Sequence, residues 1–433
     1  MKNIFYLLLI TIAGFIFLIF CNIQCSPNSE EEHRTVREKW EDAKFGLFVH
    51  WGPVSLKGKE IGWSRGREIP IEEYDSLYKK FNPTRFDAEE WVSLLKEAGM
   101  KYLVIVTKHH DGFVMWDSET TDYDIMSTPY KKDIIKQLSE ECREQGILFG
   151  TYYSIADWWH PDYPLVENRN GRKEGANMEA YIDYMKAQIK ELVDKYHTKI
   201  LWFDGEWEEP WTHEMGKDMY GYVKSLDEDI LINNRVDKGR KGMEGITKSK
   251  KYAGDFATPE QQVGRFDTTT LWESCITIGN QWAWKPDDEI KSREECIRLL
   301  VQTAGGGGNL LFNVGPKPDG TIEARQAKRL REIGDWLNEY EESIYGTKGG
   351  PLPPQDWGVS TQKGDQVYLH ILEQKDNIYI ENFPYEVSDI RLLNNNGKVT
   401  YEQRGNSLDI SLLNTKPSAV GDIIALTCNK QKI

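Results

Sequence analysis

The feature that most constrains the fold is an alternation of short apolar runs with amphipathic helical patterns, from Phe45 to about Tyr345. This alternation is typical of βαβ units, in which a helix covers each strand of a parallel sheet. We expect strands at Phe45–Trp51, Tyr102–Lys108, Leu148–Ser154, Lys199–Gly205, Ile230–Arg235, Leu271–Cys275 and Asn309–Val314, with an eighth around Lys251–Asp255. The clearest helical patterns cover Ala88–Ala98, Asp133–Gln145, Met178–Tyr196, Arg293–Thr303 and Glu323–Tyr340.

Two architectures accommodate such a sheet: an irregular (β/α)8 TIM-like barrel and an open, doubly wound sheet. The open sheet favours a glycine-rich phosphate loop directly after its first strand, and no such loop follows Trp51. The glycine run Gly305–Gly308 follows a helix and leads into a strand, as a tight αβ turn does. We therefore predict an α/β fold with an irregular barrel over residues 26–346.

The composition changes after Gly349–Pro354, where the helical patterns stop and short alternating strands begin. These strands are expected at Gln366–Leu372, Asn377–Asn382, Asp389–Leu393, Ser407–Ser411 and Asp422–Thr427. They suit a C-terminal antiparallel β-sandwich over residues 347–433. Because no cluster of surface aromatic residues stands out there, a role in stabilising the barrel is favoured over carbohydrate binding.

The first 25 residues have the order of an export signal, with a positive charge before an apolar run that ends at Cys21 and Cys25. This order resembles a bacterial lipoprotein signal, in which one of the two cysteines carries lipid after cleavage. A plain secretory signal and an uncleaved anchor helix are the alternatives. We predict an exported protein, in the periplasm or at the outer cell surface, whose membrane contact is the lipid anchor alone. The acidic stretch Ser29–Glu32 favours the surface.

The net charge of −15 disfavours nucleic acid and anionic membrane surfaces as partners. The chain contains 15 Trp and 21 Tyr, whose flat apolar rings suit the faces of sugars. The remaining cysteines are widely spaced and form no Cys-x-x-Cys pair, so they are expected to be buried thiols and not zinc ligands. They are Cys142, Cys275, Cys296 and Cys428.

Polar and aromatic residues gather where four of the expected strands end. They are His50 with Trp51, the run Lys108–Asp111, the run Tyr152–Ser154, and Trp202 with Asp204. The carboxyl ends of barrel strands form the mouth where catalytic groups meet, so these residues should converge. The adjacent His109 and His110 point to opposite faces of a strand, which makes shared ligation of one metal ion awkward. Hydrogen bonding to substrate hydroxyls, or orientation of a nearby carboxylate, fits them better.

Asp204 ends a buried apolar run and is the first candidate for a catalytic carboxylate; its alternative role is to cap the following turn. A retaining glycosidase needs a second carboxyl group about 5–5.5 Å away. Glu260 and Glu273 are both candidates, and their spacing alone does not choose between them. Glu206 and Glu208 lie in an acidic loop and are expected to be solvated surface carboxylates.

Five motifs follow one another at the expected strand ends and turns: Lys44–Gly52, Thr107–Phe113, Phe149–Ser154, Trp202–Gly205 and Gly307–Pro316. Together and in this order they resemble the α-L-fucosidases of glycoside hydrolase family 29. The resemblance extends from about Glu41 to Gly346. It implies an irregular barrel followed by a β-sandwich, and a double-displacement mechanism that retains the anomeric configuration. Both agree with the interpretation of the residues alone.

The resemblance also implies roles for individual residues. Asp204 matches the nucleophile and Glu260 the general acid/base, with Glu273 in reserve because this residue lies on a variable loop in the family. The bound sugar would be surrounded by His50, His109, His110, Tyr152, Trp202, Arg235 and Trp282. Imidazole and guanidinium groups would donate hydrogen bonds to its hydroxyls, and the Trp282 ring would pack against the side that carries the C5 methyl group.

These roles predict an exo-acting α-L-fucosidase that acts on fucosylated oligosaccharides or glycoconjugates through a covalent fucosyl-enzyme intermediate, without a metal or organic cofactor. Two alternatives stay open: a related α-L-galactosidase and a non-catalytic, fucose-binding lipoprotein. Linkage preference is expected to depend on the loops Gly62–Glu73, Trp158–Gly175 and Lys238–Lys251.

Overall fold

The computed structural model describes residues 34–430 except 168–169, 394–397 and 414–419. The expected export signal, with Cys21 and Cys25, and the acidic stretch Ser29–Glu32 lie outside the described residues. In the part of the chain that is described, no helix has both the length and the apolar character needed to cross a bilayer. The cysteines expected to be buried thiols are confirmed as such; they are Cys142, Cys275, Cys296 and Cys428.

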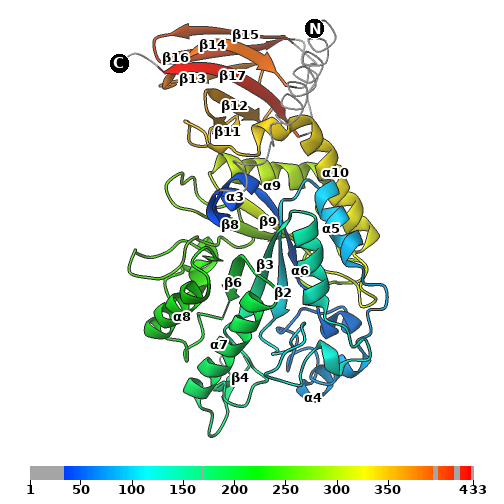
Figure 1. Ribbon diagram of the computed structural model, residues 1–433. Coiled ribbons are helices and arrows are strands. Elements are labelled where there is room, and N and C mark those ends of the chain that lie inside the picture. The colour runs from blue at the N-terminus through cyan, green and yellow to red at the C-terminus, as the bar shows by residue number, and fades with distance from the viewer. Residues whose placement is uncertain (1–33, 168–169, 394–397, 414–419, 431–433) are drawn as a thin grey trace, which may run out of the picture.

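A curled parallel sheet forms the centre of the larger, α/β part of the molecule (Figure 1). Within the described residues its strands follow the order β7 (Leu231–Ile232), β6 (Ile200–Asp204), β3 (Leu148–Ser154), β2 (Tyr102–Lys108), β1 (Phe45–Val49), β9 (Asn309–Val314) and β8 (Glu273–Thr277). Strands β1, β2, β6 and β9 are buried along their whole length. Burial on both faces explains their near-continuous apolar sequences.

The sheet closes into a barrel through residues 255–261, which form single bridges instead of a regular eighth strand. At one edge, the Asp255 N–H donates to the carbonyl of Ile232 in β7 over 2.7 Å. At the other edge, the Gln261 N–H donates to the carbonyl of Cys275 in β8 over 2.9 Å. The predicted irregular (β/α)8-like barrel is therefore confirmed.

Three elements of the barrel sheet differ most from the prediction. The strand expected at Ile230–Arg235 is reduced to β7 and gives way to a 3-10 turn at Asn234–Val236. The strand expected at Leu271–Cys275 covers Glu273–Thr277. The eighth element, expected around Lys251–Asp255, joins the sheet a few residues later. These shifts place Arg235 and the segment that carries Glu260 in irregular backbone at the mouth of the barrel.

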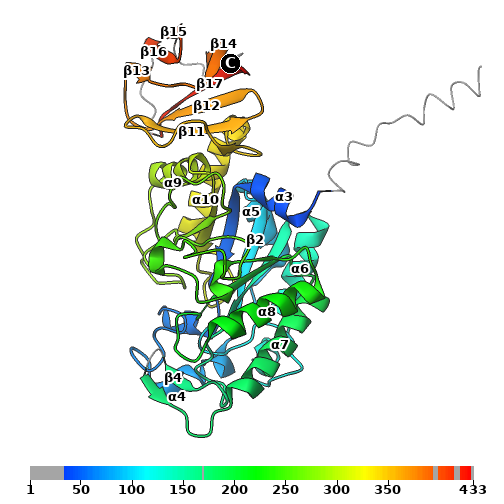
Figure 2. The same cartoon turned by 90° about the vertical axis from the view of Figure 1, so that its left-hand side faces the viewer.

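Helices surround the sheet (Figures 1 and 2). They are α5 (Ala88–Glu97), α6 (Ile134–Glu144), α7 (Met178–Asp194), α8 (His213–Leu226), α9 (Arg293–Gly305) and α10 (Ala324–Tyr340), preceded by α3 (Val36–Ala43). Helices α5 to α9 begin after an Asp, Asn, Thr or Ser whose side chain accepts a hydrogen bond from a backbone N–H of the first turn. Such caps satisfy donors that the helix itself leaves free. The predicted helices are present, and α3 and α8 are additional ones.

The C-terminal part is an antiparallel β-sandwich, as predicted (Figure 1). In the described residues, one sheet contains β10 (Lys348–Gly349), β11 (Gly358–Lys363), β12 (Gln366–Ile371), β17 (Asp422–Lys430) and β14 (Tyr385–Leu392), and the other contains β13 (Asn377–Ile380), β16 (Ser407–Leu413) and β15 (Lys398–Arg404). The two sheets share an apolar core of their own. Val359 of β11 lies against Gly305 at the end of α9, so the sandwich rests on the barrel opposite its mouth.

Candidate active site

A cavity of about 200 Å³ opens at the carboxyl ends of the barrel strands, where catalytic groups of such barrels lie. Its lining residues are Phe48, His50, Trp63, His109, Tyr152, Trp202, Asp204, Trp207, Arg235, Arg240, Met243, Glu260 and Trp282. The lining combines aromatic rings with carboxylate and guanidinium groups. Most of the site residues named from the sequence meet here, whereas His110 lies behind Asp204 and Glu273 lies deeper in the barrel.

Asp204 ends β6 and is almost fully buried, with 7% of its surface exposed. Its Oδ1 accepts a hydrogen bond from Arg235 Nη1 at 2.7 Å, and its Oδ2 accepts one from the Tyr152 hydroxyl at 2.8 Å. Burial acts to raise the pKa of Asp204, but the nearby Arg235, His110 and Arg240 outweigh it and hold the pKa below its ordinary value. The carboxylate is therefore ionised and held in place, as a nucleophile must be.

Arg235 joins the two candidate catalytic carboxylates. Its Nη1 donates to Asp204 and its Nη2 donates to Glu260 Oε2 at 2.8 Å, while its Nε donates to the Thr258 hydroxyl at 2.9 Å. The guanidinium lies 4.4 Å from the centre of the Trp202 ring. Binding to neighbouring nitrogens of one planar group brings the two carboxylates close together, as the short separation in retaining glycosidases requires.

Glu260 lies on the segment that closes the barrel. Its backbone N–H donates to the carbonyl of Met243 at 2.9 Å, which fixes the segment against the loop after β7. Its side chain retains 18% exposure and lines the cavity. Because Oε2 accepts from Arg235, a proton on this carboxyl group would sit on Oε1.

Glu273, the reserve candidate, lies in the interior of the barrel and does not line the cavity. Its carboxylate accepts hydrogen bonds from Trp40 Nε1, from the Tyr102 hydroxyl and from Trp202 Nε1. Complete burial raises the pKa of Glu273 to about 7, although these three donors oppose the shift. Glu273 therefore holds the Trp202 ring in position by accepting its Nε1 hydrogen bond, and it does not contact the cavity in which a substrate would bind.

His50 presents a hydrogen-bond acceptor to the cavity. Its Nδ1 lies 2.6 Å from Asn313 Oδ1, and Asn313 Nδ2 donates to the carbonyl of Trp282 at 2.8 Å. Since the amide nitrogen of Asn313 donates to a carbonyl, its oxygen accepts, and His50 Nδ1 therefore carries the proton. Burial lowers the pKa of His50 to about 3, which leaves the ring neutral and its Nε2 an acceptor.

His110 has the same tautomer for a different reason. The Ser154 hydroxyl donates to the carbonyl of Ala156 at 2.6 Å, so it accepts from His110 Nδ1, also at 2.6 Å. Burial lowers the pKa of His110 to about 4, and its unprotonated Nε2 lies 3.7 Å from Asp204 Oδ2. The expectation that imidazole groups donate to sugar hydroxyls is corrected at His50, which lines the cavity and offers an acceptor.

Glu206 and Glu208 are not the surface carboxylates that the sequence suggested. Glu206 is 3% exposed and Glu208 is fully buried. Glu206 Oε1 accepts from Arg240 Nε at 2.6 Å, and Glu208 accepts from Trp158 Nε1 and from the Tyr163 hydroxyl. Their partners approach from distant parts of the chain, which an acidic local composition does not reveal.

Comparison with known proteins agrees with this geometry. The family model described as Alpha-L-fucosidase matches residues 22–342. The chain belongs to this family. Among its fucosidase relatives, tissue alpha-L-fucosidase of Bos taurus is 30% identical over 77% of this chain and 74% of its own length, and plasma alpha-L-fucosidase of Homo sapiens is 30% identical over 77% and 75%.

Solved fucosidase structures share the fold of this family member. Alpha-L-fucosidase isoenzyme 1 from Paenibacillus thiaminolyticus superposes with a TM-score of 0.81 at 32% identity, covering 92% of this chain and all of that one. A GH29 alpha-L-fucosidase from Bacteroides thetaiotaomicron, trapped as a covalent intermediate in complex with 2-fluoro-fucosyl fluoride, superposes with a TM-score of 0.82 at 28% identity, covering 91% of this chain and 96% of that one.

The rim of the fucosidase cavity contains residues that were not named from the sequence: Phe48, Trp63, Trp207, Arg240 and Met243. Phe48 lies within the first strand motif, where its role could have been read from its place before His50. The other four lie on loops, and neither periodicity nor spacing tells which loop side chains turn inward. The Glu60 carboxylate fixes one such loop, because it accepts from the backbone N–H groups of Trp282 and Ala283.

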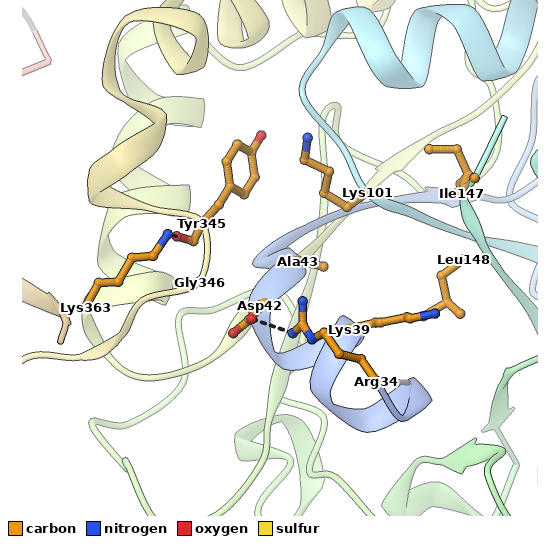
Figure 3. A pocket seen from close by; sticks show the side chains of 11 residues that line it. Arg34, Lys39, Asp42, Ala43, Lys101, Ile147, Leu148, Tyr345, Gly346 and Lys363 are labelled. Atoms are coloured by element: carbon orange, nitrogen blue, oxygen red, sulfur yellow. Dashed lines mark hydrogen bonds and ion pairs between the residues drawn. The ribbon is translucent and has the colours of Figure 1, made fainter. Parts of the chain in front are cut away.

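A larger cavity, of about 570 Å³, lies at the opposite end of the fucosidase barrel (Figure 3). Lys101, which precedes β2, and Leu148, which begins β3, line it together with Lys363 of the sandwich. Asp42, the one carboxylate in its lining, is paired with Arg34 at 2.5 Å. A cavity at the amino ends of the strands without a pair of carboxylates does not suit glycoside hydrolysis.

Proposed function

We propose that this chain is an exo-acting, retaining α-L-fucosidase that removes terminal α-L-fucose from fucosylated oligosaccharides or glycoconjugates. The observation that carries the proposal is the pairing of Asp204 and Glu260 on the Arg235 guanidinium beside a cavity the size of one sugar ring. A small cavity at the barrel mouth suits the end of a glycan and not its middle. The covalent intermediate trapped in the Bacteroides thetaiotaomicron relative supports the double-displacement mechanism.

In the first step, an Asp204 oxygen attacks the anomeric carbon as the bond from that carbon to the leaving oxygen breaks. Glu260, protonated on Oε1, gives its proton to the leaving oxygen, and a fucosyl ester of Asp204 results. The Tyr152 hydroxyl and Arg235 hold the attacking carboxylate in position throughout. Positioning of this kind removes much of the entropic barrier.

In the second step, the ionised Glu260 takes a proton from a water molecule that attacks the anomeric carbon. The ester bond to Asp204 breaks, and L-fucose leaves with its original anomeric configuration. At the end of this step Asp204 is again ionised and Glu260 is again protonated, and Arg235 binds both as at the start.

The cavity walls fit a sugar with an apolar edge. Phe48, Trp202 and Trp282 supply ring surface, and His50 supplies a nitrogen acceptor for a hydroxyl group that donates. We place the C5 methyl group of fucose against Trp282, because an aromatic ring favours a methyl group over a hydroxymethyl group.

The purified protein is expected to hydrolyse 4-nitrophenyl α-L-fucoside, and to hydrolyse the matching α-L-galactoside with a kcat/KM lower by about 10². The added C6 hydroxyl of the galactoside would face apolar ring surface without a hydrogen-bond partner. Both rates can be followed by nitrophenol release under the same conditions. A faster galactoside would support the related α-L-galactosidase instead, and binding of fucose without turnover of either glycoside would support a binding protein.

We also propose that residues 1–25 act as a lipoprotein-type export signal and that the enzyme reaches the periplasm or the outer cell surface with a lipid on Cys21 or Cys25. The order of charge, apolar run and cysteine supports this. Labelled palmitate should be incorporated into the full chain, and only one of Cys21→Ser and Cys25→Ser should prevent it. If palmitate were incorporated neither into the wild type nor into either variant, this result would contradict lipidation. Protease treatment of whole cells distinguishes surface exposure from a periplasmic location.

A further inference from the structure

Five charged groups, three of them buried and two partly exposed, form the proposed catalytic centre and its surroundings: the buried Asp204, Glu206 and Arg235, and the partly exposed Glu260 and Arg240. With every group ionised, the cluster carries one excess negative charge. With Glu260 protonated, as the first step of hydrolysis requires, the cluster is neutral. The form with Glu260 protonated is therefore favoured by the charge balance, because uncompensated charge is costly in a site with little access to water. Glu206 is the carboxyl group that the mechanism above does not use.

Glu206 acts on the centre through Arg240. Its Oε1 accepts from Arg240 Nε at 2.6 Å, while Arg240 Nη1 donates to the carbonyl of Gly242 at 2.8 Å and lies 3.7 Å from Glu260 Oε2. The Arg240 side chain is itself only 8% exposed. The guanidinium therefore lies between Glu206 and Glu260 and is shared by them.

The second oxygen of Glu206 gives an independent indication. In the part of the chain that the structure describes, Glu206 Oε2 is buried without a hydrogen-bond partner. A buried carboxylate oxygen without a partner is costly, and its presence calls for an explanation. Because a buried charge needs hydrogen bonds more than a neutral group does, Glu206 costs stability in this position, and such costs are typical of functional sites.

We propose that Glu206 is a positioning residue that, through Arg240, offsets part of the positive potential at the catalytic pair and so allows Glu260 to act as the proton donor of the first step. This inference rests on the proposed fucosidase function. Without the charge of Glu206, two guanidinium groups would face two carboxyl groups, and the cluster would be neutral only with both carboxyl groups ionised. The first step instead requires a proton on Glu260.

Other charged and titratable groups around the cluster leave this charge relation in place. Lys238 contributes a positive charge near Glu206, but Glu208 and Glu209 also act on Lys238, and its Nζ donates to the carbonyl of Glu208. His110, which faces Asp204, is neutral, and the Tyr152 hydroxyl donates to Asp204. Burial raises the pKa of Glu206, and Arg240 opposes that shift most strongly. The ion pair with Arg240, at 2.6 Å, is the contact that favours the charged form of Glu206.

The test is the pH dependence of kcat/KM for a fucosylated disaccharide, whose poor leaving group needs protonation. The alkaline limb of this profile reports loss of the proton from the general acid, and the acidic limb reports the nucleophile. In Glu206→Gln, both limbs are expected to move to lower pH by about one pH unit, because one nearby negative charge has been removed. A merely structural role would lower the rate without moving the limbs.

Arg240→Gln provides the matched variant with the opposite sign. Removing its positive charge should move both limbs to higher pH by a similar amount, and the double variant should return them toward the wild-type positions. Unmoved limbs in Glu206→Gln, or shifts of the same sign in both single variants, would overturn the inference. Failure of the wild type to hydrolyse any α-L-fucoside would instead refute the proposed function.

Discussion

Replacing Asp204 with alanine is expected to lower kcat/KM for α-L-fucosides by about 10⁴-fold, whatever the leaving group. The variant keeps the cavity walls but has no oxygen to bond to the anomeric carbon, so the fucosyl ester cannot form. Arg235 would also lose one of its two carboxylate partners, which disturbs the position of Glu260. The measurement is nitrophenol release from 4-nitrophenyl α-L-fucoside by the wild type and the variant at matched concentrations.

Azide distinguishes loss of the nucleophile from general damage to the site. In Asp204→Ala, azide can enter the space that the carboxylate vacates and attack the anomeric carbon directly, which should give β-L-fucosyl azide with inverted configuration. Thermal unfolding of the variant checks that the barrel is intact. Substantial activity without azide, or an azide product of retained configuration, would show that Asp204 is not the nucleophile.

The fold could be predicted from the sequence where strands are long and buried. Runs such as Tyr102–Lys108 are apolar because helices and the barrel interior cover both faces, and this burial is what the pattern records. The closing segment was placed too early, at Lys251–Asp255, because residues 255–261 are held by single bridges. Such bridges impose no periodicity on the side chains, so no pattern marks them.

The site could be predicted where strand direction alone determines the position of a residue. His50 and Asp204 end or follow parallel strands, and parallel strands deliver their carboxyl ends to one edge. The choice between Glu260 and Glu273 depends on which carboxyl group turns toward the cavity, and spacing carries no such information. Glu206 was misjudged because its partner, Arg240, comes from a loop that follows α8 and β7 in the chain.

Replacing Glu260 with alanine is expected to lower kcat/KM for fucosylated oligosaccharides by about 10²–10⁴-fold, and for aryl fucosides far less. A sugar alcohol is a poor leaving group and needs the proton from Glu260, whereas a nitrophenolate leaves without it. The second step lacks its base with either substrate, so the fucosyl ester should accumulate and nitrophenol should appear in a burst. Stopped-flow measurement of that burst, together with steady-state rates on both substrates, tests the expectation.

Glu273→Ala is the matched control, because it removes a carboxyl group from the same barrel without opening the cavity. It leaves the buried donors of Trp40, Tyr102 and Trp202 without their acceptor, which should cost roughly 1–3 kcal/mol of stability for each unpaired group. Azide should restore turnover of aryl fucosides in Glu260→Ala and give α-L-fucosyl azide, since it attacks the ester formed by Asp204. Rescue of Glu273→Ala with no rescue of Glu260→Ala would reverse the assignment of the acid/base, because only the residue that activates water can be replaced by a nucleophile that needs no activation.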